Sequence, residues 1–301
     1  MNAALLNAYG GVEVLEVHDV AEPRPGKGEV KIRLAAASIN QFDIKVRSGR
    51  VKSWFPVQFP LVLGFDGSGV VVEVGPDTST FKVGDHVFGL ISHSHAQFAV
   101  AAATGLAAVP QGLEPVEAAS LPIVGLTGVQ LIEEGVAPKK GETVLVTGAL
   151  GSVGRAAVYA GRLLGARVIG AVRARQLADA KKLEVDGLVA LDDLGAVGRL
   201  GPLDAVADTV GGDAVIGLLA RLRPGGIWAG VVAGPKGANE RGIKVHDIQT
   251  RPDATRLSAL AKALSAGELV IPIAQRLALA QIREAHRAVE QGAPGKVVVL
   301  L

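Results

Sequence analysis

The residues whose spacing is most informative about chemistry form a glycine-rich turn near the middle of the chain. The apolar, β-branched run VLVT at residues 144–147 leads into GALGSVG at residues 148–154, and residues 155–164 have the pattern of a helix. A strand, a glycine-rich turn and a helix in this order hold the pyrophosphate of a dinucleotide, because free N–H groups and the positive end of the helix dipole meet at the turn. The segment therefore predicts a dinucleotide site.

Two glycines of this turn have separate tasks. Gly151 lets the backbone approach the phosphates, and Gly154 lets the helix pack closely against the strand. Ala149 replaces the first glycine of the G-x-G-x-x-G pattern, so the interpretation also depends on the flanking strand and helix. The residues of the turn expected to bind the cofactor are Ala149, Gly151, Ser152, Val153 and Gly154. Two later residues, Val210 and Val232, are also expected to bind it.

Two arginines after the next expected strand indicate which dinucleotide binds. Arg173 follows the apolar run at residues 167–172, where an NAD enzyme would carry an acid for the ribose 2′-hydroxyl. No Asp or Glu occurs between Gly154 and Asp179, and Arg173 and Arg175 offer forked donors to a 2′-phosphate. Charge-assisted hydrogen bonds of roughly 1.5–3 kcal/mol correspond to about a 10- to 100-fold preference for NADPH. The alternative is that both arginines are ordinary surface charges.

The composition of the chain excludes several classes of protein and several kinds of site. At 301 residues the chain is long enough for two domains, and its 49% hydrophobic and 20% charged residues are an ordinary balance. A net charge of +2, without a basic cluster among aromatics, gives no sign of nucleic-acid binding. Neither a signal peptide nor a membrane span is expected, because residues 1–11 lack a basic region before an apolar core and no apolar run reaches about 18 residues. The absence of cysteine excludes disulfides, cysteine nucleophiles and thiolate metal sites, and it favours a cytoplasmic location.

The order of the expected elements predicts an α/β protein of two domains. Short strands separated by turns precede residue 110, and helices are expected from Pro115 and over residues 126–134. Residues 143–250 alternate between strands and helices, as a doubly wound parallel six-stranded sheet requires. The tail after residue 253 has the pattern helix, strand, helix, strand, and we expect it to complete the first domain. The expected strands are residues 12–17, 30–34, 69–74, 86–90, 143–147, 167–172, 187–191, 205–208, 226–232 and 243–248.

Several short segments outside the glycine-rich turn carry a family signature. They are AAASINQFD at residues 35–43, RSG at 47–49, LGFDGSGVV at 63–71, FKVGDHVFG at 81–89, GLTG at 125–128, DTVGG at 208–212 and GKVVV at 295–299. In this order, and together with the turn, they resemble the medium-chain dehydrogenase/reductase superfamily. The nearest resemblance within it is to the zinc-free quinone oxidoreductase group related to zeta-crystallin.

The resemblance implies a fold and a division of the chain. A GroES-like β-rich catalytic domain would comprise residues 1–123 and 251–301, and a Rossmann NADPH-binding domain would comprise residues 124–250. The active site would lie in the cleft between them. Relatives of this kind commonly form homodimers by pairing their last Rossmann strand, here residues 243–248, which would otherwise leave an open sheet edge.

The resemblance also bears on metal binding. Zinc-dependent members hold a catalytic metal with a Cys, a His and a Cys, and the matching positions here are Asn40, Phe65 and Ile123. An amide, a phenyl ring and an aliphatic side chain cannot form a zinc site. His93 and His95 stand two residues apart, but no third ligand is evident nearby. We therefore expect no metal.

The chemistry that remains is hydride transfer without a Lewis acid. Such a site does not readily stabilise an alkoxide, but it can reduce an acceptor with its own electron sink, such as a quinone or an α,β-unsaturated carbonyl. We therefore expect an NADPH-dependent, zinc-independent reductase of quinones or of the activated C=C bonds of enones and enals. Asn40 is the expected donor to the acceptor carbonyl, or else a local turn cap. Thr127 matches the family position near the nicotinamide, or else satisfies its own helix backbone.

Four other polar residues have weaker assignments. Lys296 is expected to reach the cofactor from the opposite domain, or else to be an ordinary turn lysine. Asp43 and Asp66 are expected to organise loops rather than to transfer protons. His95 is a candidate proton donor, or else a surface or structural histidine, and proton return by water or by no residue fits better because no tyrosine acid is present.

Two other functions are compatible with the same dinucleotide-binding residues. A non-catalytic NADPH-binding sensor or structural protein would bind the cofactor with the same residues, but it would not need polar groups facing the nicotinamide. An enoyl-thioester reductase of this superfamily would carry a tyrosine acid just after the RSG segment, and residues 50–52 contain none.

Overall fold

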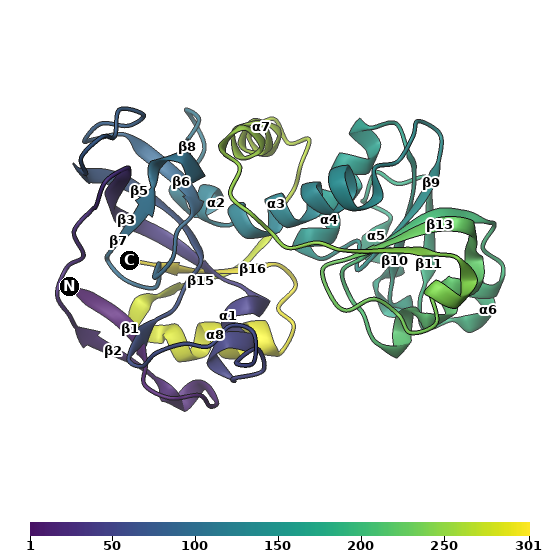
Figure 1. Ribbon diagram of the computed structural model, residues 1–301, viewed down its shortest axis with the longest axis horizontal. Helices are drawn as coiled ribbons and strands as arrows, with labels where there is room; N and C mark the ends of the chain where they lie inside the picture. Colours follow the sequence, from purple (N-terminus) through teal and green to yellow (C-terminus); the bar gives the residue numbers. More distant parts are fainter. The chain divides into compact units, whose positions relative to one another are not determined.

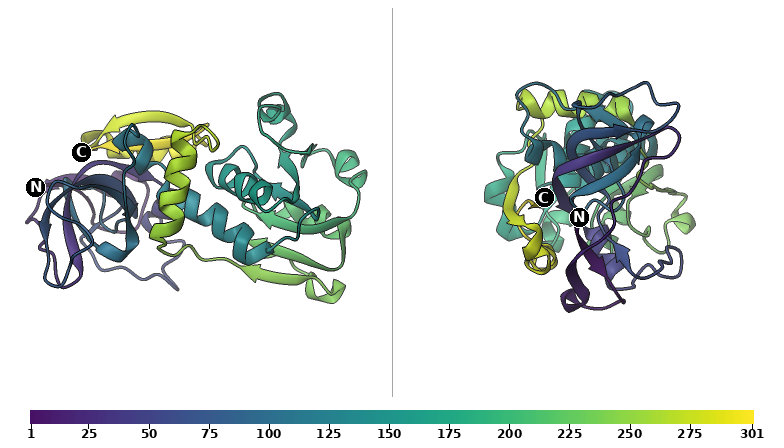
Figure 2. Two further views of the ribbon diagram at one scale, coloured as in Figure 1. Left: turned by 90° about the horizontal axis from the view of Figure 1, so that it is seen from above. Right: turned by 90° about the vertical axis from the view of Figure 1, so that its left-hand side faces the viewer.

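The computed structural model describes residues 1–301, with the exception of the side chain of Asn239. The chain forms two compact units (Figure 1). Unit 1 comprises Met1–Ile123 and Pro252–Leu301, and unit 2 comprises Val124–Arg251. Figure 2 shows both chain ends on unit 1, so the last part of the chain returns to the unit in which the chain begins.

The sheet of unit 2 is the doubly wound parallel sheet that the sequence predicts. Its six strands are all parallel and follow the order β11-β10-β9-β12-β13-β14. In chain order within the unit this is the Rossmann order 3-2-1-4-5-6, which reverses direction between β9 and β12. The strands are β9 (Thr143–Thr147), β10 (Arg167–Val172), β11 (Gly187–Ala190), β12 (Leu203–Asp208), β13 (Leu222–Gly230) and β14 (Lys244–Asp247).

Two helices of unit 2 differ in their bounds from the prediction. α4 (Ser152–Leu163) begins three residues before the predicted start at residue 155, because Gly151 is already its N-cap. The helix expected over residues 126–134 is α3 (Pro122–Gln130), continued by the π-helical segment Leu131–Val136. No helix in the described part of the chain is long and apolar enough to cross a membrane. The other helical segments of the unit are short: α5 (Leu177–Ala180), α6 (Leu194–Gly198) and the 3-10 helices Ala174–Gln176, Asp213–Arg221 and Asn239–Arg241.

Unit 1 is built around one long strand. β3 (Glu29–Ile39) pairs antiparallel with β5 (Asp66–Val74), β7 (Phe98–Ala102) and β16 (Lys296–Leu300). Because Val297 is opposite Ile39, the register brings Lys296 beside Asn40. The remaining elements are β1 (Asn2–Leu6), β2 (Leu15–Asp19), β4 (Leu61–Val62), β6 (His86–Leu90), β8 (Leu106–Ala108), β15 (Ile273–Ala278), α1 (Gln41–Arg47), α2 (Pro115–Ala119), α7 (Ala254–Ser265), α8 (Ile282–Glu290) and the 3-10 helices Val12–Val14, Ala103–Gly105 and Leu279–Gln281.

The N-terminal segment departs from the prediction. The strand expected over residues 12–17 is wrong in its first half, where Val12–Val14 is a 3-10 helix and β2 begins at Leu15. The Glu13 carboxylate accepts the N–H of Gly11 at 2.9 Å, and this local turn replaces the start of the strand. β1 was not predicted, because its sequence NAALL is rich in helix-forming residues. Its pairing with β2 and β4 overrides that propensity.

The packing of α3 on α4 leads to a stability prediction. A Cβ at Gly128 would lie 2.6 Å from Ala156 Cβ and 2.7 Å from Ala157 N. Gly128→Ala should therefore lower the free energy of unfolding of unit 2 by about 1–3 kcal/mol through overpacking. Gly198→Ala is the control, because a Cβ there meets nothing within 4 Å and alanine favours a helix.

The measurement is urea unfolding followed by the fluorescence of buried Trp228, in a Trp54→Phe background. Equal midpoints for the two variants would contradict this description of the helix contact.

Candidate active site

The turn between β9 and α4 is built around its glycines. Gly148 has a φ of +61°, which suits glycine. A Cβ at Gly154 would overlap the Gly148 carbonyl oxygen and lie 2.8 Å from Ala149 Cα, so the close packing predicted for Gly154 is present. Gly151 provides no side-chain cap to α4, so the first N–H groups of the helix, from Ser152 onward, face the turn uncapped. This arrangement fits a phosphate group, which such N–H groups and the helix dipole attract.

Asp208 fixes a second turn beside the first, and the sequence analysis did not assign it a role. Its fully buried Oδ1 accepts hydrogen bonds from Thr147 Oγ1 at 2.7 Å and from the N–H groups of Val210 at 3.0 Å and Gly211 at 3.1 Å. Val210 is 46% exposed and follows β12, and Val232 follows β13. Val210 thus stands at the carboxyl end of a strand that borders the reversal of strand order, where dinucleotides bind in this fold, and Val232 stands at the carboxyl end of the next strand.

Arg173 and Arg175 lie directly after β10. Both are exposed, and within the described residues neither guanidinium makes a hydrogen bond or an ion pair. The backbone of Arg173 makes two hydrogen bonds with Gln176: its N–H donates to Gln176 Oε1 at 3.1 Å, and its carbonyl oxygen accepts the N–H of Gln176 at 2.8 Å. The two side chains are thus free to meet a ligand at this end of the sheet.

Thr127 lies on α3 and is 6% exposed. Its hydroxyl oxygen is 2.5 Å from the hydroxyl oxygen of Thr250, which belongs to the same unit. Nearby, the Gln130 carboxamide donates to the carbonyl of Arg251 at 2.9 Å and accepts its N–H at 3.1 Å. α3 therefore holds the segment that leads out of unit 2.

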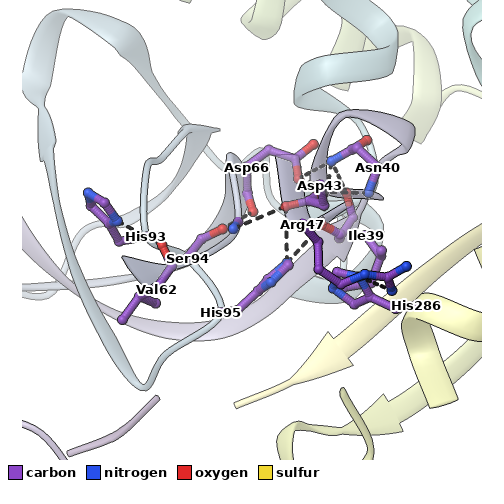
Figure 3. A network of polar contacts seen from close by, with 12 residues as sticks. Ile39, Asn40, Asp43, Arg47, Val62, Asp66, His93, Ser94, His95 and His286 are labelled. Carbon is purple, nitrogen blue, oxygen red and sulfur yellow. Dashed lines mark hydrogen bonds and ion pairs between the residues drawn. The ribbon is translucent and has the colours of Figure 1, made fainter. Parts of the chain in front are cut away.

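In unit 1, the Asn40 side chain is fixed between a lysine and a carboxyl group. Figure 3 shows Asn40 close to Asp43 and Asp66. Lys296 Nζ donates to Asn40 Oδ1 at 2.6 Å, and Asn40 Nδ2 donates to Asp66 Oδ1 at 3.0 Å. Because an ammonium group only donates, these contacts define which way the carboxamide points. Asp66 also accepts the Ser38 hydroxyl at 2.7 Å and the N–H of Ile123 at 3.2 Å. We call Asn40, Asp43, Asp66, His95 and Lys296 the polar cluster.

Asp43 and His95 complete the polar cluster, and both are fully buried. Asp43 accepts the N–H of Asn40 at 2.8 Å and that of Gly64 at 3.1 Å. His95 Nε2 lies 3.9 Å from Asp43 Oδ1 and 3.4 Å from the carbonyl oxygen of Ser38. Within the described residues, His95 Nδ1 has no hydrogen-bond partner.

Burial dominates the ionisation of the polar cluster. It raises the pKa of Asp43 to about 7, against the hydrogen bond from Asn40 and the charge of Lys296. It also raises the pKa of Asp66 and lowers the pKa of Lys296. The pKa of His95 falls to about 4, chiefly through the same loss of solvation. His95 is thus neutral and enclosed near pH 7, which does not suit the proton donor suggested by the sequence.

Arg47 anchors the helix that carries Asn40 at its start. Arg47 is 1% exposed, donates to the Gly10 carbonyl at 3.3 Å and forms an ion pair with Glu290. Its Nη1 lies 3.3 Å from Nδ1 of His286, which is buried on α8. These contacts fix α1 against α8.

The three positions aligned with zinc ligands all border Asp66. Asn40 and Ile123 donate to its carboxyl group, and Phe65 precedes it. Phe65 packs instead on Phe42, with ring centroids 4.8 Å apart. In the described part of the chain, no group of three or more His, Cys, Asp or Glu side chains could hold a metal ion. The residues at these positions do not fit a catalytic zinc.

Comparison with known proteins agrees with this fold. Residues 26–112 match the alcohol dehydrogenase GroES-like domain, and residues 172–299 match the zinc-binding dehydrogenase family. A chloroplast envelope quinone oxidoreductase homolog from Arabidopsis thaliana is 37% identical over 196 residues. The match covers 62% of this chain and 60% of that relative, so the chain spans less than two thirds of the relative's length.

Solved structures resemble the whole chain. The quinone oxidoreductase from Coxiella burnetii is 28% identical, with a TM-score of 0.91 over 100% of this chain and 99% of its own. A mycobacterial protein described as complexed with NADPH has a TM-score of 0.88 at 28% identity, and an NAD-dependent alcohol dehydrogenase has one of 0.90 at 29% identity. Each of these two matches covers 100% of both chains.

The two domains and the parallel sheet define the fold of a nicotinamide-dependent dehydrogenase. Within this class, the chain has the two-domain fold of the medium-chain dehydrogenase/reductase family, and the relatives and solved structures that it resembles include quinone oxidoreductases.

The raised pKa of Asp43 predicts a pH-dependent stability. Between the ordinary value of 3.8 and about 7, the folded protein keeps a proton that the unfolded chain has released. The contribution of Asp43 to stability therefore falls as the pH rises through this interval. The free energy of unfolding of the wild type, relative to Asp43→Asn, should fall by about 1.4 kcal/mol per pH unit, as measured by urea unfolding. A difference that does not change with pH would contradict the assignment.

Removal of the Lys296 ammonium should destabilise the folded protein, because the buried carboxyl groups are then left without a compensating charge. Lys296→Met should lower the free energy of unfolding by about 3–5 kcal/mol above neutral pH, because the carboxyls lose their compensating charge. The double variant Lys296→Met/Asp66→Asn should recover part of this loss. Lys262→Met, at an exposed position on α7, is the control and should change stability by about 0.5 kcal/mol or less. A loss at Lys296 no larger than at Lys262 would show that the lysine does not balance the polar cluster.

Proposed function

We propose that this protein is an NADPH-dependent, zinc-independent reductase that transfers hydride to quinones or to the activated C=C bonds of enones and enals. The observation that carries the proposal is the polar cluster. Where zinc-dependent relatives hold a metal, this chain has Asn40 and Ile123 bonded to Asp66, and Phe65 in an aromatic contact. These residues provide no Lewis acid for an alkoxide, so they favour an acceptor that stabilises its own developing charge.

The residues that would hold the cofactor are in unit 2. The uncapped N-terminus of α4 would bind the pyrophosphate, with Val210 and Val232 beside it. Arg173 and Arg175 would bind the 2′-phosphate that distinguishes NADPH from NADH. When bound, the dihydronicotinamide would supply the hydride.

Asn40 would orient the acceptor through one hydrogen of its amide. Lys296 and Asp66 fix the carboxamide, and the remaining contacts of Asn40 Nδ2 are long, at 3.4 Å to the carbonyl and hydroxyl oxygens of Ser38, so one of its hydrogens is only weakly bonded. This hydrogen is the one left for an acceptor oxygen on which negative charge develops. Thr127, whose hydroxyl is oriented by Thr250, would contact the nicotinamide.

The proposal includes a homodimer. β14 is the last strand of the parallel sheet and pairs with β13 alone. A second copy of this strand would complete the hydrogen bonding of that edge.

Turnover of an acceptor panel tests the proposed function. The purified protein would be mixed with NADPH and a benzoquinone, a naphthoquinone, an alkenal, a cyclic enone or an enoyl-CoA, and the loss of dihydronicotinamide absorbance would be followed. We expect turnover with quinones or enones, and none of an alcohol with NADP⁺. Binding of NADPH without any turnover would instead support a sensor or a structural protein. Turnover confined to the enoyl-CoA would support an enoyl-thioester reductase.

The choice of cofactor can be tested at the exposed arginines. Arg173→Ala should weaken NADPH binding by about 10-fold or more and leave NADH binding unchanged, because only the 2′-phosphate contact is lost. The measurement is titration of each dinucleotide by its fluorescence. Arg167→Ala, at the opposite end of the same strand, is the control. Equal weakening of NADPH and NADH by Arg173→Ala would contradict the assignment.

A further inference from the structure

The loop between α1 and β4 exposes aromatic side chains that the proposed function does not use. Trp54 is 62% exposed and Phe59 is 38% exposed. Pro56 and Pro60 of the same loop are exposed as well. We call residues 48–60 the aromatic loop. Exposed apolar side chains that are grouped in one segment are typical of an interaction surface.

The two exposed rings are anchored on other rings of unit 1. The ring centroid of Trp54 lies 6.0 Å from that of Phe42 and 6.2 Å from that of Phe55. Phe59 packs edge-on against Tyr9, with ring centroids 4.9 Å apart. Because these contacts hold the rings in place, little conformational freedom is left to lose when the aromatic loop binds a partner.

The backbone of the aromatic loop is also held in place. The N–H of Lys52 donates to the carbonyl of Gly49 at 3.2 Å. The N–H of Trp54 donates to the carbonyl of Val51 at 3.1 Å. Two successive turns thus hold a cationic residue and an exposed aromatic residue two positions apart.

The charged side chains of this part of the chain are all positive. Residues 44–65 contain no Asp or Glu. Of their four basic residues, Arg47 is buried and ion-paired on α8. The other three are Lys45, Arg50 and Lys52, whose side chains form no ion pair within the described residues. Three cations without an acidic partner therefore accompany the exposed rings.

An anionic membrane surface matches both properties of the aromatic loop. Tryptophan favours the boundary between lipid headgroups and hydrocarbon, and lysine and arginine are attracted to anionic headgroups. A single-stranded nucleic acid would instead need a basic groove that follows its backbone. The aromatic loop offers three cations, and it forms one side of a mostly apolar pocket of about 300 Å³. Apolar surface of this kind favours lipid over nucleic acid.

We propose that the aromatic loop docks unit 1 on an anionic membrane surface. Trp54 inserts at the level of the headgroups, and Lys45, Arg50 and Lys52 lie beside anionic lipids. The attachment is reversible, because one inserted aromatic side chain and three charges are a weak anchor. The proposal goes beyond the proposed function and does not depend on it, since docking needs neither cofactor nor acceptor.

Vesicle binding by the whole protein tests the proposal. Vesicles of phosphatidylcholine and phosphatidylglycerol, or of phosphatidylcholine alone, would be added while tryptophan fluorescence is followed. The chain contains only one other tryptophan, Trp228, which is buried in unit 2, so Trp54 reports the contact. We expect a blue shift and quenching by lipids with brominated acyl chains. Binding should be about 100-fold stronger on the anionic vesicles, at about a factor of five for each cation. Salt at about 1 M should remove this preference.

The role of the exposed ring can be tested with a matched pair of variants. Trp54→Ala should weaken cosedimentation with the anionic vesicles about 10-fold or more, because the inserted apolar surface is lost. Leu194→Ala, at an 80% exposed position that begins α6 in unit 2, is the control and should bind like the wild type. Equal binding by the two variants would overturn the assignment of Trp54.

The role of the charges can be tested in the same way. Arg50→Gln/Lys52→Gln should weaken cosedimentation about 25-fold, at about a factor of five for each charge. Lys139→Gln/Lys140→Gln removes the same charge from exposed positions of unit 2 and should have no comparable effect. Equal losses in the two double variants would show that net charge, and not the aromatic loop, attracts the vesicles.

The remaining outcomes separate the membrane from other partners and from the proposed function. A wild type that ignores anionic vesicles, or that binds neutral ones equally well, would overturn the membrane proposal. Binding of a single-stranded oligonucleotide or of polyglutamate as strong as that of the vesicles, and undiminished in Trp54→Ala, would indicate a general site for polyanions instead. An active reductase that does not bind vesicles would overturn only this proposal, and an inactive protein that binds them would overturn only the reductase.

Discussion

Unit 1 depends on the contact of Lys296 with Asn40. The buried carboxyl groups of Asp43 and Asp66 lie close enough to act on the charge of Lys296. A buried charge is costly unless it is paired, and the Lys296 ammonium is paired here with the carboxyl groups of Asp43 and Asp66. Such clusters add little net stability, but they fix geometry. Here they fix the Asn40 carboxamide. Because Lys296 begins the last strand of the chain, β16 must return to β3 before the polar cluster exists.

The fold was predictable where its signals are local. β9 and β10 begin and end at the predicted residues, because central parallel strands have continuous apolar runs bounded by turns. The parallel, doubly wound character of the sheet followed from the alternation of its strands with helices. β1 and the segment before β2 were not predictable in this way. Pairing with distant strands and one local carboxylate turn decide their structure.

Individual residues of the candidate site could be predicted from the sequence, but the contacts among them could not. The close approach at Gly154 followed from the spacing of the glycines, and Asn40 and Lys296 were both singled out. The sequence assigns Lys296 to the cofactor and predicts no contact with Asn40, because the register of β16 on β3, which brings the two together, is not encoded locally. The burial of His95 and the exposure of His93 are likewise tertiary properties, so alternation along the chain could not distinguish them.

We propose that a hydrogen-bonded cluster takes the place of the metal of zinc-dependent relatives and that the protein is nevertheless a reductase. The most direct test is to measure the zinc content and the NADPH–quinone turnover of one sample, before and after exhaustive chelation. We expect zinc far below one ion per chain and a turnover that chelation does not change. Turnover that disappears with the metal and returns on addition of zinc would contradict the proposal.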